Sequence, residues 1–195
     1  MATLEVRPGG YVIGVPLMLM GSLDAASAVY AYWMLRIAVD GPEAYWASFR
    51  DDGPLPLSAA VRRGGVSARS LAAALSPLVA AHYRGVRGTD AFDAALHGAR
   101  QGLPVLVRLP PASAVYPEGH HLVVRGFCRI VGSGYEDDQL IVNDPAIGER
   151  FLSREELRAC RSLARRPFHV FVGREPWRDR TRLPPDPLRR VDRPV

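Results

Sequence analysis

The sequence predicts a single α+β domain, in which a helical N-terminal half is followed by a mainly antiparallel sheet. Helical spacing of apolar residues prevails up to residue 100, whereas short, branched, apolar segments typical of strands prevail over residues 103–172. A chain of 195 residues with 48% hydrophobic content can bury one sizeable core. We therefore expect one domain over residues 1–173 and an extended or disordered Pro- and Arg-rich tail over residues 174–195.

The helical half is expected to contain three helices. The apolar run over residues 11–20 is too short to span a membrane and is interpreted as a first strand or a buried entry segment. The spacing of apolar residues then predicts helices over residues 25–39, 67–82 and 89–100. The segment at residues 51–57, which begins Asp-Asp-Gly-Pro, is expected to be a loop between the first two. Thr89 or Asp90 is expected to cap the third helix.

The second half is expected to be a sheet interrupted by one helix. Its apolar segments predict strands at residues 103–109, 122–130, 140–143 and 168–172. Ser153 and Glu156 have the spacing of a capping box, in which each side chain bonds the backbone amide of the other residue. This motif predicts a helix that runs to about Leu163.

Composition excludes several classes of function. Every basic residue is Arg, so a Schiff-base lysine and the lysine of a phosphate-binding P-loop are both absent. The tail has seven Arg against four acidic residues, but no aromatic and basic motif accompanies it, so nucleic-acid binding is not expected. Cys128 and Cys160 lack CxxC spacing, which indicates two buried thiols and a reducing, cytoplasmic setting.

The histidines do not form a pattern of metal ligands. His120 and His121 are consecutive on a predicted strand, so their side chains leave on opposite faces and cannot share one ion. His82, His97 and His169 have no companions at ligand spacing and are interpreted as structural. We therefore expect neither a metal nor a cofactor.

Two polar residues next to strands are candidates for acid-base chemistry. His120 follows Gly119, whose lack of a side chain permits close approach of a substrate. Asp144 stands between Asn143 and Pro145 at the end of a later strand. A hairpin centred on Tyr135 would put Asp144 opposite Gly126, about 20 Å along the strand from His120. The pair can therefore touch only if residues 128–138 leave the sheet unevenly.

The order of these motifs resembles a known family. The segments are 103–107 (LPVLV), 119–127 (GHHLVVRGF), 142–148 (VNDPAIG) and 151–156 (FLSREE). They are similar to the second half of bacteriocin-leader (double-glycine) peptidases, which are papain-like cysteine peptidases. The resemblance implies a papain-like fold, His120 as general base, Asp144 as its orienting acid, and a substrate cleft that includes Gly119, His121, Asp24 and Asn143.

The first half departs from this family, which places Asp-Cys-Gly at the start of its long helix and a glutamine before the cysteine. Here the nucleophile position falls on Ala25, or on Leu23 in another register, and no glutamine precedes either residue. Ser22 and Ser27 lie nearby, but serines at or inside helix ends usually bond the local backbone, and this is the role we expect for them.

Two functions follow from the resemblance. The first is a catalytically degenerate peptidase-like protein, a pseudoenzyme that binds a peptide or peptide-like substrate in a papain-type cleft. The second is a cysteine peptidase or an acyl-transfer or hydrolytic enzyme of the same bacteriocin-processing family, either silenced by a Cys-to-Ala change at Ala25 or using His120 and Asp144 as a base dyad. The missing glutamine favours the first function, because a change at Ala25 alone would not explain it.

Overall fold

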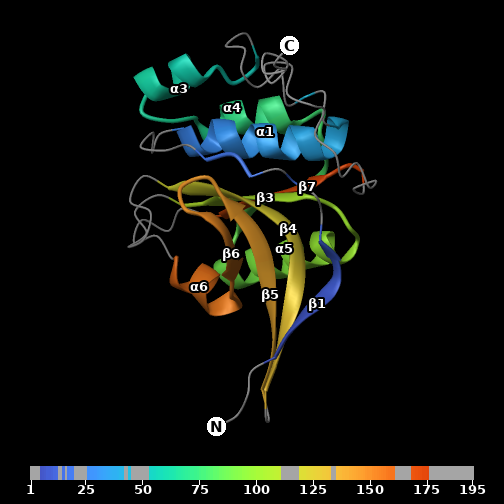
Figure 1. Cartoon of the computed structure of the whole chain (residues 1–195). Coiled ribbons are helices and arrows are strands. Elements are labelled where there is room, and N and C mark those ends of the chain that lie inside the picture. Colours follow the sequence, from blue (N-terminus) through green and yellow to red (C-terminus); the bar gives the residue numbers. More distant parts are fainter. Residues whose placement is uncertain are drawn as a thin grey trace, which may run out of the picture.

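A computed structural model describes residues 5–12, 15, 17–19, 26–41, 44, 53–110, 119–132, 135–160 and 168–175, and every structural statement below concerns these residues. The chain is an α+β protein in which helices cover both faces of an antiparallel sheet (Figure 1). Its helices are α1 (Ser27–Asp40), α3 (Leu57–Arg62), α4 (Ala68–Leu75), α5 (Gly88–Arg100) and α6 (Arg154–Ala159). Its strands are β1 (Glu5–Val12), β2 (Val79–Val86), β3 (Val105–Leu109), β4 (His120–Gly132), β5 (Tyr135–Asp144), β6 (Gly148–Leu152) and β7 (Phe168–Gly173).

The sheet has the strand order β2-β7-β3-β4-β5-β6, and β1 also pairs with β4. All of these pairings are antiparallel. The 13 residues of β4 make it the longest strand. Its first part, residues 120–124, pairs with β3, while residues 126–131 pair with β1 on the same side. This long strand therefore links the centre of the sheet to the β4–β5 hairpin that extends away from the helices in Figure 1.

The two faces of the sheet pack against different helices, and side chains alternate between them along each strand. Leu106 and Val123 belong to the apolar cluster formed with α1 and α4, whereas Val107 and Leu122 belong to the cluster formed with α5 and α6. In Figure 1 the layer of α1, α3 and α4 lies above the sheet and α5 and α6 lie below it. Odd-numbered residues at the start of β4 therefore face α1, and even-numbered residues face α5 and α6.

The predicted helix over residues 67–82 is wrong in its second half. Helix α4 ends at Leu75, and the segment from Val79 becomes β2, which pairs with β7. Pro77 follows the last turn and lacks the amide hydrogen that a continuing helix requires. The alanines at positions 80 and 81 suit a helix in isolation, so tertiary pairing with β7 overrides their local preference.

Two predicted helix boundaries also need correction. Helix α5 begins at Gly88 with Arg87 as its N-cap and no side-chain cap, so neither Thr89 nor Asp90 caps it. The capping box of Ser153 and Glu156 is confirmed, but α6 ends at Ala159 with Cys160 as its C-cap, earlier than predicted. Residues 11–20 were expected to form a first strand or a buried entry segment, whereas β1 ends at Val12 and Val15 beyond it is buried. The predictions missed β6 and α3, and the expected tail falls outside the described residues beyond Glu175.

Among the residues that the structure describes, no helix has the length and apolar character needed to cross a membrane.

Candidate functional site

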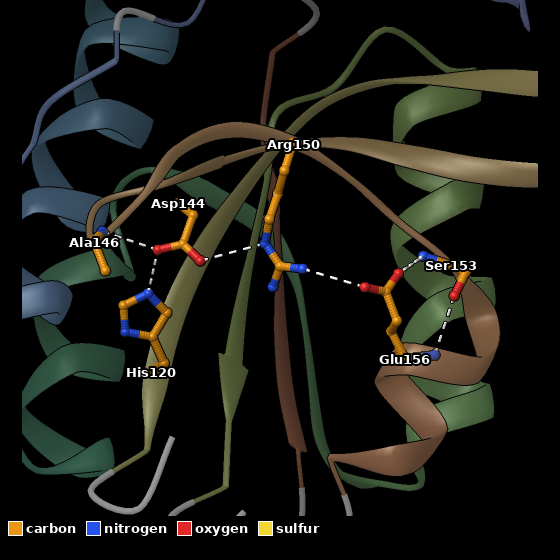
Figure 2. A network of polar contacts seen from close by, with 6 residues as sticks. All are labelled: His120, Asp144, Ala146, Arg150, Ser153 and Glu156. Carbon is orange, nitrogen blue, oxygen red and sulfur yellow. Dashed lines mark hydrogen bonds and ion pairs between the residues drawn. The ribbon is translucent and has the colours of Figure 1, made fainter. Parts of the chain in front are cut away.

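The structure brings His120 and Asp144 into direct contact. His120 Nε2 lies 2.6 Å from Asp144 Oδ1, and both side chains are buried, with exposures of 2% and 0%. The same carboxylate oxygen accepts a hydrogen bond of 2.9 Å from the amide of Ala146, which forms the turn that follows β5 (Figure 2). A carboxylate oxygen accepts, so the Nε2–H of His120 is the donor of this hydrogen bond.

The contact arises from the register of the β4–β5 hairpin. Gly132 pairs with Tyr135 at the end of the hairpin, and a bulge falls between Val124 and Gly126. Val123 therefore pairs with Asn143, so that Asp144 lies only a short way along the sheet from His120. The expectation that the pair needs an uneven loop over residues 128–138 is wrong, because Tyr135 itself pairs with Gly132 and the described residues of this range stay paired.

Asp144 also belongs to a polar network that reaches α6. Arg150 on β6 forms an ion pair of 3.4 Å with Asp144 Oδ2, and its Nη1 lies 3.5 Å from Glu156 Oε1. Glu156 accepts a 2.7 Å hydrogen bond from the Ser153 amide, while Ser153 Oγ accepts one of 3.1 Å from the Glu156 amide. Figure 2 shows this chain of contacts from β4 across β5 and β6 to the first turn of α6. The network ties the sheet edge to α6.

His121, not His120, faces α1. His120 pairs with Leu109 and shares its face of the sheet, where Leu109 packs with α5 and α6. His121 pairs with Arg108 on the opposite face, and its Nδ1 lies 3.0 Å from Ser27 Oγ in the first turn of α1. From the sequence we expected His120 to face this helix. The alternation of side chains along β4 shows that His121 faces it instead.

His121 is buried in an electropositive setting. Its side chain is 7% exposed, and burial together with the nearby Arg108 guanidinium holds the pKa of His121 well below its ordinary value. The imidazole is therefore neutral at pH 7. Its Nε2 has no hydrogen-bond partner among the described residues, so one polar atom of a buried ring remains unsatisfied.

A pocket of about 510 Å³ opens at this place. Its wall includes Ser27 on α1, Arg108 on β3, Gly119 and His121 at the start of β4, and Arg63 between α3 and α4. Arg63 and Arg108 contribute positive charge to the described part of the wall.

The predicted site residues thus lie on two different faces of the sheet. Gly119 and His121 line the pocket, whereas His120 and Asp144 lie on the other face of the sheet. Asn143 is fully buried and its side-chain amide donates a 3.0 Å hydrogen bond to the carbonyl of Val15. Leu23, Asp24 and Ala25 lie outside the described residues, as does Ser22.

The sequence did not single out Ser27, Arg63 or Arg108 as site residues. Ser27 was assigned a local role, but its hydroxyl instead contacts a ring 94 positions away along the chain. Only the pairing of Arg108 with His121 shows that these cationic groups meet, and that register requires the structure.

The remaining histidines and cysteines lie elsewhere. His82 Nε2 lies 3.1 Å from His169 Nδ1, and His82 stacks on Phe171 with 4.0 Å between ring centroids. Cys128 and Cys160 are unpaired and buried, as predicted, and burial raises the pKa of both thiols. Neither cysteine belongs to the described pocket wall.

Comparison with known proteins gives one finding. No family model matches the chain, and no curated protein matches it. One solved structure is similar: a double glycine motif protease from an AMS/PCAT transporter, in complex with the leader peptide. The two chains share 19% sequence identity with a TM-score of 0.44, and the match covers 86% of this chain and 97% of the other. We draw no functional inference from a resemblance of this size.

Proposed function

We propose that the chain binds an extended peptide with a free carboxyl end in a papain-type cleft, and that it does so without a cysteine nucleophile. The observation that carries the proposal is the charge of the pocket beside α1. Arg63 and Arg108 contribute positive charge to its described wall, and the neutral imidazole of His121 lies in the same wall. Arginine presents a planar fork of donors that matches a carboxylate, so a peptide's terminal carboxyl group is a suitable ligand.

The absence of a thiol from the pocket supports binding rather than covalent peptidase chemistry. A cysteine nucleophile reacts as the thiolate, which an electropositive and accessible setting favours. Cys128 and Cys160 have the opposite setting, because both are buried and have raised thiol pKa values. The pocket wall therefore contains groups that can bind a peptide, and the two thiols lie elsewhere.

A binding experiment tests the proposal directly. Fluorescently labelled peptides that end in Gly-Gly are titrated with the protein, each as the free acid and as the C-terminal amide. We expect the acid to bind at least about tenfold more tightly, since a charge-assisted hydrogen bond contributes about 1.5–3 kcal/mol. Equal affinity of acid and amide, or no binding of either, would contradict the proposal.

Arg63 and Arg62 provide a matched pair of variants. Both are exposed and adjacent at the end of α3, but only Arg63 lines the pocket. Arg63→Ala should remove most of the preference for the free acid, whereas Arg62→Ala should keep it. A similar loss in both variants would mean that general positive charge attracts the peptide and that the pocket does not.

A second candidate function is a peptidase whose cysteine has been replaced at Ala25. The contact between His120 and Asp144 favours it, since a histidine held by a carboxylate is a typical base dyad. The position of this dyad on the α5 side of the sheet weighs against it. Ala25→Cys decides between the functions: selective labelling by a thiol-reactive peptide electrophile, with cleavage after Gly-Gly, would support the peptidase, and binding without labelling would support the recognition protein.

A further inference from the structure

The first turn of α1 places a serine hydroxyl against a buried imidazole at the pocket. Ser27 and His121 come from opposite halves of the chain, and 3.0 Å separates Ser27 Oγ from His121 Nδ1. Both side chains are more than nine-tenths buried, yet both contribute to the wall of the same pocket. A ligand that contacts this part of the wall would therefore meet the hydroxyl and the ring together.

The surroundings favour negative charge at Ser27. The 14 residues of α1 begin at Ser27, and the N-cap residue Ala26 provides no side-chain hydrogen bond to the first turn. Amides in the first turn of a helix lack partners within the helix, and its dipole adds partial positive charge there. Arg108, which pairs with His121, adds a full positive charge nearby. An oxyanion that forms beside Ser27 would thus meet donors and positive potential.

We propose that Ser27 is a nucleophile and His121 its general base in acyl transfer from an activated ester or thioester bound in the pocket. The neutral imidazole, protonated on Nε2, accepts the hydroxyl proton at Nδ1 as Ser27 Oγ attacks the acyl carbon. The carbonyl electron pair moves to oxygen and then returns, which breaks the bond to the alcohol or thiol. That leaving group takes the proton from Nδ1, and the acyl group remains as an ester on Ser27.

Release of the acyl group uses the same two residues. Water attacks the Ser27 ester and gives a proton to His121 Nδ1. The tetrahedral intermediate then expels Ser27 Oγ, which recovers that proton, so the products are a carboxylic acid and the original serine. No oxidant, metal or further reactant is required.

The structure limits the substrate to activated acyl groups. Asn143 lies on the same face as His121, but its amide nitrogen is bonded to the Val15 carbonyl, and Nε2 of His121 has no partner among the described residues. The imidazolium formed during attack therefore lacks a carboxylate behind it and lies near Arg108. Loss of that support in a serine hydrolase costs about 10⁴-fold in rate. Esters and thioesters tolerate this weak base, whereas a peptide amide does not.

The charge of the pocket selects among such esters. Arg63 is exposed and lies in the described wall, where its guanidinium can bind a carboxylate, so an acyl group that carries a second carboxylate should be preferred. This inference shares the pocket with the proposed peptide binding and rests on it for location only.

Acylation of the intact protein by two p-nitrophenyl esters tests the proposal. Mono-p-nitrophenyl glutarate carries the extra carboxylate, and p-nitrophenyl butyrate is its neutral counterpart. We expect a burst of nitrophenol from the glutarate ester, a mass increase of one acyl group, and its location on Ser27 by peptide mapping. The butyrate should react at least about tenfold more slowly, since one charge-assisted contact is lost. Acylation at another residue, or no acylation by either ester, would overturn the proposal.

Variants separate chemistry from folding. Ser27→Ala should abolish the burst, and His121→Gln should slow acylation by about 10²-fold, the lower end of the range for a general base, because this base lacks a supporting carboxylate. Ser76→Ala is the serine control, because Ser76 is exposed at the end of α4 and outside the pocket wall. If Ser27→Ala fails to fold, Ser27→Cys retains a nucleophile at this position and should be acylated there; a folded Ser27→Cys that is not acylated contradicts the proposal.

The two proposals fail in distinguishable ways. Peptide binding without acylation keeps the recognition function and leaves Ser27 and His121 as hydrogen-bonding groups only. Acylation of Ser27 without peptide binding removes the recognition function and keeps the acyl-transfer site.

Discussion

His120 and His121 are consecutive, yet their imidazoles lie on opposite faces of the sheet and contact different partners. His120 bonds Asp144 on the face of α5 and α6, and His121 contacts Ser27 on the face of α1. The first pair is part of a buried network that ties β5, β6 and α6 together, while the second lies at a pocket. In this dipeptide the side chain of His120 therefore belongs to a structural network, and the side chain of His121 belongs to the candidate site.

Removal of the Asp144 carboxylate should destabilise the protein strongly. Asp144 is fully buried and interacts with His120, Arg150 and the amide of Ala146, so Asp144→Ala leaves buried polar groups without a partner. We expect a loss of about 3–5 kcal/mol in the free energy of unfolding, measured by urea denaturation.

Asp138→Ala is the control for this change. Asp138 pairs with Arg100 and Arg129, whose side chains are 49% and 47% exposed, so its loss should cost less than about 1 kcal/mol. Equal costs at the two positions would show that the network around Asp144 contributes no more than a surface pair.

His82 should make the protein less stable in acid. Burial, with further contributions from His169 and Arg84, lowers the pKa of His82 from 6.5 to about 4. The unfolded chain therefore takes up a proton below pH 6.5 that the folded protein accepts only near pH 4, so stability is present above pH 6.5 and is lost as the pH falls towards 4. In His82→Gln the urea midpoint should fall less steeply over this range.

His97→Gln is the matched control for this pH effect. His97 is exposed on α5 and contacts Gln101, so the same substitution there is made away from His82, and a change of slope confined to His82→Gln belongs to His82. Part of the slope should remain in His82→Gln, because the pKa values of His121 and His169 are also lowered. A wild-type slope in His82→Gln would contradict the assignment.

Much of the fold could be predicted from local sequence patterns, because the features concerned depend on residues that are close together in the chain. The alternation along β4 and the capping box of Ser153 and Glu156 depend on neighbouring residues only, and both are present in the structure. The segment from Val79 was misassigned because its alanines suit a helix, and only pairing with β7 makes it a strand. Long-range pairing is the information that a single sequence lacks.

The candidate site was harder to predict for the same reason. Contact between His120 and Asp144 depends on where the β4–β5 turn lies and on a bulge after Val124, neither of which the sequence indicates. The side of the sheet on which α1 packs decides that His121, and not its neighbour, meets Ser27. A one-residue shift in a strand exchanges its two faces, so motif order alone assigned the wrong histidine to the helix.

Gly88 should tolerate no side chain, because α5 and α6 approach closely there. A Cβ at Gly88 would lie 2.6 Å from the carbonyl oxygen of Leu157, which is backbone and cannot rotate away. Gly88→Ala should therefore destabilise by about 1–3 kcal/mol in thermal or urea unfolding, as overpacking does.

Gly98 provides the comparison within the same helix. A Cβ there would lie 2.6 Å from a methyl group of Val105, a side chain that shifts more readily than backbone. Alanine also gains about 0.8–1.0 kcal/mol over glycine in a helix interior, so Gly98→Ala should cost less than Gly88→Ala. If Gly98→Ala cost more stability than Gly88→Ala, the backbone of α6 would shift more easily than the side chains of the sheet beside Gly98.

Both native thiols should be silent towards a thiol reagent in the folded protein. Cys128 and Cys160 are 1% and 5% exposed, and their raised pKa values reduce the thiolate that reacts at pH 7–8. Ellman's reagent should therefore titrate almost no thiol in the native state and two per chain in urea. A slightly higher pH should not restore the reaction, since burial also blocks access. Rapid labelling of either cysteine in the folded protein would contradict its burial. Ser27 is as buried as these cysteines but lies in the pocket wall, so with silent native thiols a fast labelling of Ser27→Cys would report on access through the pocket.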